Sequence, residues 1–190
     1  MAVYLQNSAF VHIPKTGGIW VKDALKSCAS VERDHIPTTA HFTPNIYYGV
    51  FLFVRKPCSW LGSLFSQRKY KKWNWDSNEL ESTCKSEDFD EFIDNVCNNE
   101  GVVERYFNQY TQKYEINNDL QVGRQENLCN DLIRILKHFN EPFNEEGLLK
   151  WNNTKRNNSG KKFGFRFELT EKQKNKVYFS QKGFYNKYYE

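Results

Sequence analysis

A continuously apolar segment, Gly49–Arg55 (GVFLFVR), constrains the fold of this chain more than any other part of the sequence. It is rich in β-prone side chains, shows no alternation of apolar and polar residues, and is followed closely by Pro57. A strand that is apolar at every position is covered on both faces, as the strands of parallel sheets are. The segment therefore predicts a central strand in a mostly parallel sheet flanked by helices.

The segments on both sides of this strand alternate between strand and helix patterns. The N-terminal stretch through Ala9–Ile13 predicts a first strand, and apolar residues at helical spacing predict a helix from about Ile19 to Ser27. This order is typical of an α/β protein. Further helices are expected after Pro57, at Phe89–Val96, Val102–Tyr114 and Asn127–Phe139, and from Thr170 onward. Short strands are expected at Ser30–Arg33 and Leu120–Gly123. Irregular segments are expected at Thr38–Tyr48, Trp73–Ser86 and Asn152–Phe165.

The length of the chain suits one α/β domain. It has 190 residues, and we interpret 1–190 as a single domain. Aromatic residues make up 16% of the chain, and their large rings can build a core although aliphatic residues are few. The sequence shows neither a signal-peptide pattern nor an apolar run of membrane-spanning length. We therefore expect a soluble, cytoplasmic protein without a membrane partner, and the sequence does not indicate its oligomeric state.

The cysteines and the charge distribution exclude several classes of site. The five cysteines form no Cys-x-x-Cys pair, so we expect no metal site. A reducing compartment is the simpler interpretation, although a disulfide between Cys84 and Cys97 stays open. The net charge is +4, with an acidic segment at Ser86–Glu104, so we expect no nucleic-acid partner even though basic clusters lie beside aromatic residues. The cysteines are Cys28, Cys58, Cys84, Cys97 and Cys129.

The loop Lys15-Thr16-Gly17-Gly18 lies between the first strand and the first helix and has the composition of an anion site. Two glycines let the backbone approach a ligand closely, and the amides that open a helix favour a negative charge. A lysine in the same loop adds a positive charge. The alternative is an ordinary strand-to-helix turn with an incidental lysine. The loop is not a Walker A motif, because the lysine precedes the glycines and no Gly-Lys-Ser/Thr follows.

At this point the sequence resembles a known family. HIPKTGG after an apolar strand is similar to the 5′-phosphosulfate-binding loop of sulfotransferases that use 3′-phosphoadenosine 5′-phosphosulfate (PAPS), in the form typical of carbohydrate (heparan-sulfate-type) sulfotransferases. Arg55, Pro57 and Ser63 stand in the register of that family's second signature. GRQENL (Gly123–Leu128) and WNNTKRN (Trp151–Asn157) resemble later family segments in the expected order. The similarity spans nearly the whole chain.

The resemblance implies a fold, a cofactor and a set of roles. The fold would be of the P-loop nucleotide-binding type, with three layers, a mostly parallel central sheet flanked by helices, and the site beyond the carboxyl ends of the strands. The cofactor would be PAPS, the product 3′-phosphoadenosine 5′-phosphate, and the partner a hydroxyl-bearing acceptor, implied to be a carbohydrate. Lys15 would bind the transferring sulfuryl group and the leaving oxygen, and Arg55 and Ser63 would bind the 3′-phosphate. The 5′-phosphate would be held by backbone amides, those of Thr16, Gly17, Gly18 and Ile19. Lys155 and Arg156 would close over the cofactor or contact an anionic acceptor, unless they belong to a solvated basic loop.

An acceptor hydroxyl also needs a general base, for which histidine is the usual choice near neutral pH. His41 is the first candidate and His35 the second, because both lie between the glycine loop and the Arg55 strand, where a family histidine often faces the acceptor. Both can equally be loop histidines. We interpret His12, inside the first strand, as a structural residue and His138, on a late helix, as a residue of the helix surface.

Two alternatives to an active sulfotransferase stay open. Ile19, Trp20 and Trp60 depart from the family pattern, which favours a non-catalytic protein that keeps the fold and binds a nucleotide. A kinase-like enzyme of the P-loop type is the other alternative, and dependence on ATP or ADP with magnesium would identify it.

Overall fold

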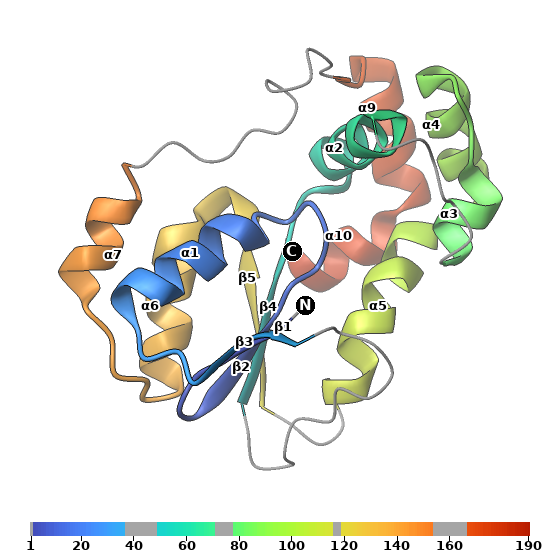
Figure 1. Ribbon diagram of the computed structural model, residues 1–190. Helices are drawn as coiled ribbons and strands as arrows, with labels where there is room; N and C mark the ends of the chain where they lie inside the picture. Colours follow the sequence, from blue (N-terminus) through green and yellow to red (C-terminus); the bar gives the residue numbers. More distant parts are fainter. Residues whose placement is uncertain (1, 37–48, 71–77, 116–118, 154–166) are drawn as a thin grey trace. The chain divides into compact units, whose positions relative to one another are not determined.

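The structure, a computed structural model, describes residues 2–36, 49–70, 78–115, 119–153 and 167–190 (Figure 1). The chain divides into two compact units, each built from two stretches of sequence. Unit 1 comprises Met1–Arg55 and Tyr110–Asn157, and unit 2 comprises Lys56–Gln109 and Asn158–Glu190. A compact unit is not by itself a domain that folds alone, so the single domain over 1–190 stays a prediction.

Unit 1 contains a five-stranded sheet in the order β3-β1-β2-β4-β5. The pairs β2–β4 and β4–β5 are parallel, whereas β1 is antiparallel to both β2 and β3. All strands except β1 therefore run in the same direction, and the protein has an α/β fold with a mixed sheet flanked by helices. The strands are β1 (Ala2–Tyr4), β2 (Ser8–Val11), β3 (Arg33–Ile36), β4 (Gly49–Val54) and β5 (Leu120–Arg124).

The N-terminal stretch is a hairpin rather than the single strand expected from the sequence. The Leu5 N–H donates to the Ser8 carbonyl over 2.8 Å, which closes the turn between β1 and β2. Gln6 and Asn7 at the turn are exposed, so two polar residues interrupt what reads as one apolar run. This hairpin adds the antiparallel pairs. The next strand also begins later than expected, at Arg33.

The central strand β4 is covered on both faces, which confirms the prediction from its continuous hydrophobicity. On one face Phe51 and Phe53 pack with Phe10 of β2 in a core cluster that includes side chains from α1, α6 and α7. Residues that alternate with these, such as Leu52 and Val54, face the other way and are equally buried. Phe53 leaves so little room at β5 that a Cβ on Gly123 would lie 2.3 Å from its ring. The helices of this cluster are α1 (Gly18–Cys28), α6 (Leu128–His138) and α7 (Glu145–Trp151), with a single 3-10 turn, Gln125–Asn127, before α6.

Unit 2 is helical and has an aromatic core. The Trp60 ring, fully buried, lies against Tyr106 and Phe107, and Phe107 packs on Phe184. The buried Gln181 side chain accepts a hydrogen bond from the Val103 N–H over 3.0 Å. Trp60, which departs from the family pattern, thus serves as a core residue here. The helices are α2 (Pro57–Tyr70), α3 (Glu79–Cys84), α4 (Phe89–Asn98), α9 (Glu171–Ser180), α10 (Lys182–Tyr188) and the first part of α5 (Val102–Glu115).

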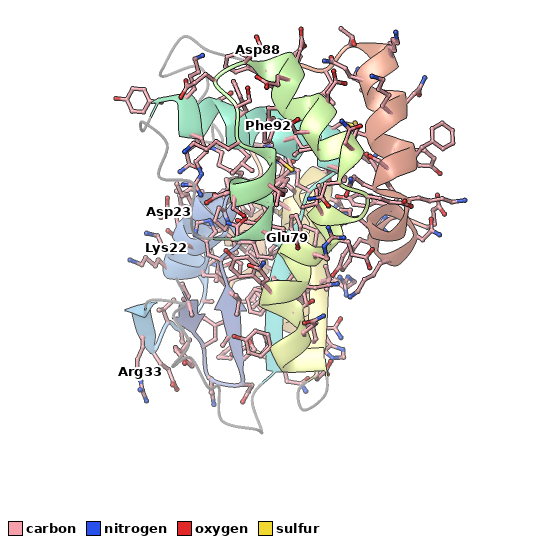
Figure 2. The ribbon with its side chains drawn as sticks, turned by 90° about the vertical axis from the view of Figure 1, so that its right-hand side faces the viewer. Lys22, Asp23, Arg33, Glu79, Asp88 and Phe92 are labelled. Atoms are coloured by element: carbon pink, nitrogen blue, oxygen red, sulfur yellow. The ribbon has the colours of Figure 1, made fainter. Side chains whose placement is uncertain are left out.

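Polar side chains begin several helices of unit 2. Thr170 and Gln173 form the capping box expected from the sequence at the start of α9. Asp88 caps α4, and Figure 2 shows it at the beginning of that helix, which also carries the buried Phe92. Asn78 caps α3 by accepting from the Glu81 N–H, so part of the stretch Trp73–Ser86, expected to be irregular, is helical. The sequence analysis missed this helix because it has only 6 residues, too few to show a period.

Some expectations fall outside the described residues. The irregular segment at Thr38–Tyr48 lies wholly there, and the one at Asn152–Phe165 does so except for Asn152 and Asn153. Among the helices that the structure describes, none is long and apolar enough to cross a membrane.

A buried carboxylate stabilises the hairpin of unit 1. Oε1 of Glu141 accepts hydrogen bonds from the Asn7 N–H over 2.9 Å and from the Ser8 hydroxyl over 2.6 Å. We expect Glu141→Ala to lower the free energy of unfolding by about 1–3 kcal/mol, because the buried Ser8 hydroxyl loses its acceptor. Urea denaturation followed by circular dichroism measures this change. The control is Glu145→Ala, which removes only an exposed ion pair with Lys137 and should cost less than about 1 kcal/mol. Equal losses in the two variants would contradict the prediction.

Candidate functional site

The glycine loop and Arg55 lie at the same edge of the sheet in unit 1. The loop leaves the carboxyl end of β2 and enters α1 at Gly18, and Arg55 directly follows Val54 at the carboxyl end of β4. Because β2 and β4 are parallel neighbours, their carboxyl ends meet at one edge. Open α/β sheets bind their ligands at such an edge.

The backbone of the loop has an uncommon conformation at two positions. Gly17 has φ 90°, which glycine adopts freely, whereas Lys15 has φ 68°, where an L side chain is disfavoured by about 1–2 kcal/mol. Between them, the buried Thr16 donates its hydroxyl to the Ile13 carbonyl over 2.9 Å. The Thr16 side chain therefore acts on the loop itself.

Arg55 connects β4 with the loop. Its Nη1 donates a hydrogen bond to the Lys15 carbonyl over 3.3 Å. A guanidinium carries five N–H donors, so this bond is compatible with a bidentate contact to an anion. This hydrogen bond joins the two cofactor motifs of the sequence resemblance, since Lys15 belongs to the glycine loop and Arg55 to the second signature.

Both loop glycines are required by close packing. A Cβ on Gly17 would lie 2.9 Å from a methyl group of Leu128 and 3.4 Å from Gln125 Cγ. A Cβ on Gly18 would lie 1.9 Å from the His12 ring. The GRQENL segment, the third part of the resemblance, thus packs directly against the loop. His12, the residue after the last residue of β2, lies against Gly18.

The start of α1 has the electrostatics of an anion site. Gly17 provides no side-chain cap, the first turn holds no acidic residue, and the first intrahelical bond runs from the Val21 N–H to the Gly17 carbonyl. Unsatisfied amides at a helix start carry a partial positive charge. Lys15 and Arg55 add two full charges beside them. The arrangement suits a phosphate or sulfate group.

His12 is held neutral next to this positive region. Burial lowers its pKa to about 4, and the amino terminus and Lys22 act in the same direction. Its ring stacks on Phe10 with centroids 6.1 Å apart and touches the first residue of α1. Figure 2 shows Lys22 on α1, one turn beyond Gly18. The interpretation of His12 as a structural residue agrees with these contacts.

The structure brings together one part of the predicted site. Lys15, Thr16, Gly17, Gly18 and Ile19 form the loop and the start of α1, with Arg55 beside them. Ile19 presents its amide in the first turn while its side chain is 48% exposed, so this departure from the family pattern does not fill the loop. The other predicted residues are Ser63, which is partly buried on α2 of unit 2; His35, which lies in β3 with only its backbone described; and His41, Lys155 and Arg156, which lie outside the described residues.

Two further features bear on the predicted chemistry. Lys56, the residue after Arg55, places its ammonium 5.7 Å from the centre of the Tyr189 ring within unit 2. His138 pairs with Asp119 on the surface of unit 1, and hydrogen bonding from Gln121 and His138 lowers the pKa of that carboxyl although partial burial opposes it. His138 is thus a surface residue, as expected.

Sequence reasoning overlooked Arg124. It ends β5 opposite Val54 of β4, so it lies at the same sheet edge as Arg55, and its N–H donates to Asp131 over 2.6 Å. The signal was present, since Arg124 ends a short apolar strand as Arg55 does and opens the GRQENL segment. Because strand neighbours cannot be read from sequence spacing, nothing pointed to its proximity.

The cysteines form no disulfide. This holds for all five, which lie in the described residues, so the candidate disulfide between Cys84 and Cys97 is not formed. Burial raises the pKa of the Cys84 and Cys97 thiols, which keeps them in the protonated form. The described residues contain no group of three or more His, Cys, Asp or Glu side chains suited to a metal ion.

Comparisons with known proteins give no family for this fold and site. Neither a protein-family model, nor a curated protein, nor a solved structure matches the chain.

The neutral state of His12 predicts a pH dependence of stability. Between about pH 4 and pH 6.5 the unfolded chain protonates this histidine while the native protein does not, so stability is present above that window and decreases as the pH falls through it. We expect the loss from His12 between pH 6.5 and pH 5 to be about 2 kcal/mol, and His12→Gln should remove it. Urea unfolding at both pH values measures the difference.

The matched control is His138→Gln, which changes an exposed histidine. That variant should keep the loss of stability seen in the wild type. If His12→Gln retained the full pH dependence, the buried neutral imidazole would not be its source.

Proposed function

We propose that this protein is a sulfotransferase that moves a sulfuryl group from PAPS to an acceptor hydroxyl. The observation that carries the proposal is the hydrogen bond from Arg55 to the Lys15 carbonyl, which joins the two cofactor motifs at one sheet edge. The packing of Gln125 and Leu128 against Gly17 supports it further, because a third motif meets the same loop. A carbohydrate acceptor is part of the proposal through the resemblance alone.

The residues at this edge fit the anionic ends of such a cofactor. The backbone of the loop can approach a ligand closely because Gly17 and Gly18 carry no side chains, and Gly17 provides no side-chain cap for the first-turn amides. Lys15 and Arg55 supply the charge. The finer fold assignment, a P-loop nucleotide-binding type with three layers, belongs to this proposal; the strand–loop–helix order of β2 and α1 beside the parallel β4 supports it.

Each side chain would have a defined task. Bound PAPS supplies an activated sulfuryl group on a good leaving group, so the protein contributes position and charge rather than a covalent nucleophile. The backbone amides of the loop and of the start of α1 would hold the 5′-phosphate, namely those of Thr16, Gly17, Gly18 and Ile19. The Lys15 ammonium would stabilise the negative charge that develops on the leaving oxygen. Arg55 would hold the 3′-phosphate with a bidentate fork.

The remaining assignments stay predictions. His41 or, second, His35 would accept the proton of the acceptor hydroxyl. Ser63 would add a hydroxyl to the 3′-phosphate, and Lys155 and Arg156 would close over the cofactor. His12 is a poor candidate for the base, since its contact with Gly18 and its lowered pKa suit support of the loop.

Ligand-induced thermal stabilisation tests the cofactor. We expect adenosine 3′,5′-bisphosphate to stabilise the wild type by about 2.7 kcal/mol at a concentration a hundred times its Kd, and AMP to stabilise it far less. Arg55→Ala should lose this preference, because a charge-assisted contact to the 3′-phosphate is removed. Arg134→Ala is the matched control; that arginine hydrogen-bonds Gln121 and the Val122 carbonyl on β5, away from the loop. Better stabilisation by ADP with magnesium would favour the kinase alternative, and no stabilisation by any nucleotide would reject the cofactor assignment.

Turnover tests the role of Lys15. With PAPS and a panel of glycan acceptors, Lys15→Ala should lower kcat by about 10²–10³-fold, since it removes the charge that stabilises the leaving oxygen. Release of 3′-phosphoadenosine 5′-phosphate measures the rate. Lys22→Ala, which changes a lysine on α1 beyond the loop, should retain most of the activity. Cofactor binding without turnover on any acceptor would instead favour the non-catalytic alternative.

A further inference from the structure

The loop needs something to hold Lys15 in its left-handed conformation. Lys15 has φ 68°, and a lysine has neither the freedom of glycine nor the short polar side chain that helps asparagine there. Thr16 fixes the preceding carbonyl of Ile13, and Gly17 is wedged against Leu128. Neither contact acts on the Lys15 peptide itself.

Arg55 acts on that peptide. Its guanidinium donates to the Lys15 carbonyl over 3.3 Å, and a peptide group is planar and trans, so its C=O and N–H point in opposite directions. Fixing the Lys15 carbonyl therefore fixes the direction of the Thr16 N–H, one of the amides assigned to the 5′-phosphate. It also fixes the point from which the Lys15 side chain extends.

Arg55 is suited to this task because its own backbone is anchored. It follows Val54, a buried residue of the central strand that pairs in parallel with β5. A side chain that extends from so rigid an element holds a partner with little loss of conformational freedom.

We infer that Arg55 is a positioning residue for Lys15 as well as a ligand of the 3′-phosphate, so that the 3′-phosphate subsite and the sulfuryl subsite are coupled through one guanidinium. This inference rests on the proposed function. A 3′-phosphate on Arg55 orders the guanidinium and thereby the Lys15 peptide. The groups at the 5′ end of the cofactor then bind more tightly when the 3′-phosphate is present. This coupling favours PAPS over adenosine 5′-phosphosulfate in addition to the direct contact between Arg55 and the 3′-phosphate.

Binding measurements on ligands that fill one subsite test the coupling. Adenosine 5′-phosphosulfate lacks the 3′-phosphate, yet Arg55→Ala should weaken its binding by about 5-fold or more in calorimetry. Arg55→Lys, which retains a cation able to donate to the carbonyl but no fork, should bind adenosine 5′-phosphosulfate nearly as the wild type does while binding adenosine 3′,5′-bisphosphate more weakly. Arg134→Ala should change neither. Unchanged binding of adenosine 5′-phosphosulfate to Arg55→Ala, with weaker binding of the bisphosphate, would overturn the inference and leave the proposed function intact.

A double-mutant cycle, measured by melting temperature and without any nucleotide, tests whether Arg55 positions the Lys15 backbone. Lys15→Gly removes the left-handed penalty, so it should raise the Tm in the wild-type background. In the Arg55→Ala background the loop is already released, and the same change should raise the Tm by less. Equal increments in the two backgrounds would overturn the inference. Failure of every nucleotide to bind the wild type would reject the proposed function. The double-mutant cycle would still decide whether Arg55 holds the Lys15 backbone.

Discussion

The complete burial of β4 determines where the candidate site can form. Every residue of this strand is buried, so both of its faces are covered by other parts of the protein. Its parallel pairing with β2 and β5 brings their carboxyl ends to one edge, where Lys15, Arg55 and Arg124 follow. Replacing any of its side chains by a polar one would bury an unsatisfied group in this layer. The anion site therefore depends on a strand whose side chains never touch the ligand.

The loop is stabilised by contacts of another kind. The Thr16 hydroxyl forms a hydrogen bond within the loop, and Arg55 donates one to it from the end of β4. Close packing adds to these contacts, since His12 and Leu128 leave no room for a Cβ on the two glycines. A loop held in this way has little freedom to lose when it binds an anion, which favours affinity and orientation together.

The elements with strong periodicity could be predicted from the sequence, and those decided by tertiary contacts could not. The continuous hydrophobicity of Gly49–Arg55 predicted a strand buried on both faces, and the Thr170 capping box predicted the start of α9. The β1–β2 hairpin was missed because its polar turn is as short as Gln6 and Asn7. At the site, residue types and order pointed to Lys15 and Arg55, but no spacing rule relates Arg124 to them, because β4 and β5 become neighbours only through the sheet. The hydrogen bond between Arg55 and the Lys15 carbonyl likewise arises only when the backbone is folded, so no sequence pattern predicts it.

The charges and the backbone conformation of the loop are not those that would make it most stable. Lys15, Arg55 and the start of α1 place positive charge together, and His12 meets it only by remaining neutral. Lys15 also adds backbone strain. A loop selected for stability alone would have glycine or asparagine at that position and an acidic residue in the first turn of the helix. The first turn of α1 has no acidic residue, and a strained lysine stands where glycine would be more stable, so the loop is less stable than it could be and carries positive charge at the start of a helix, a place that favours an anion.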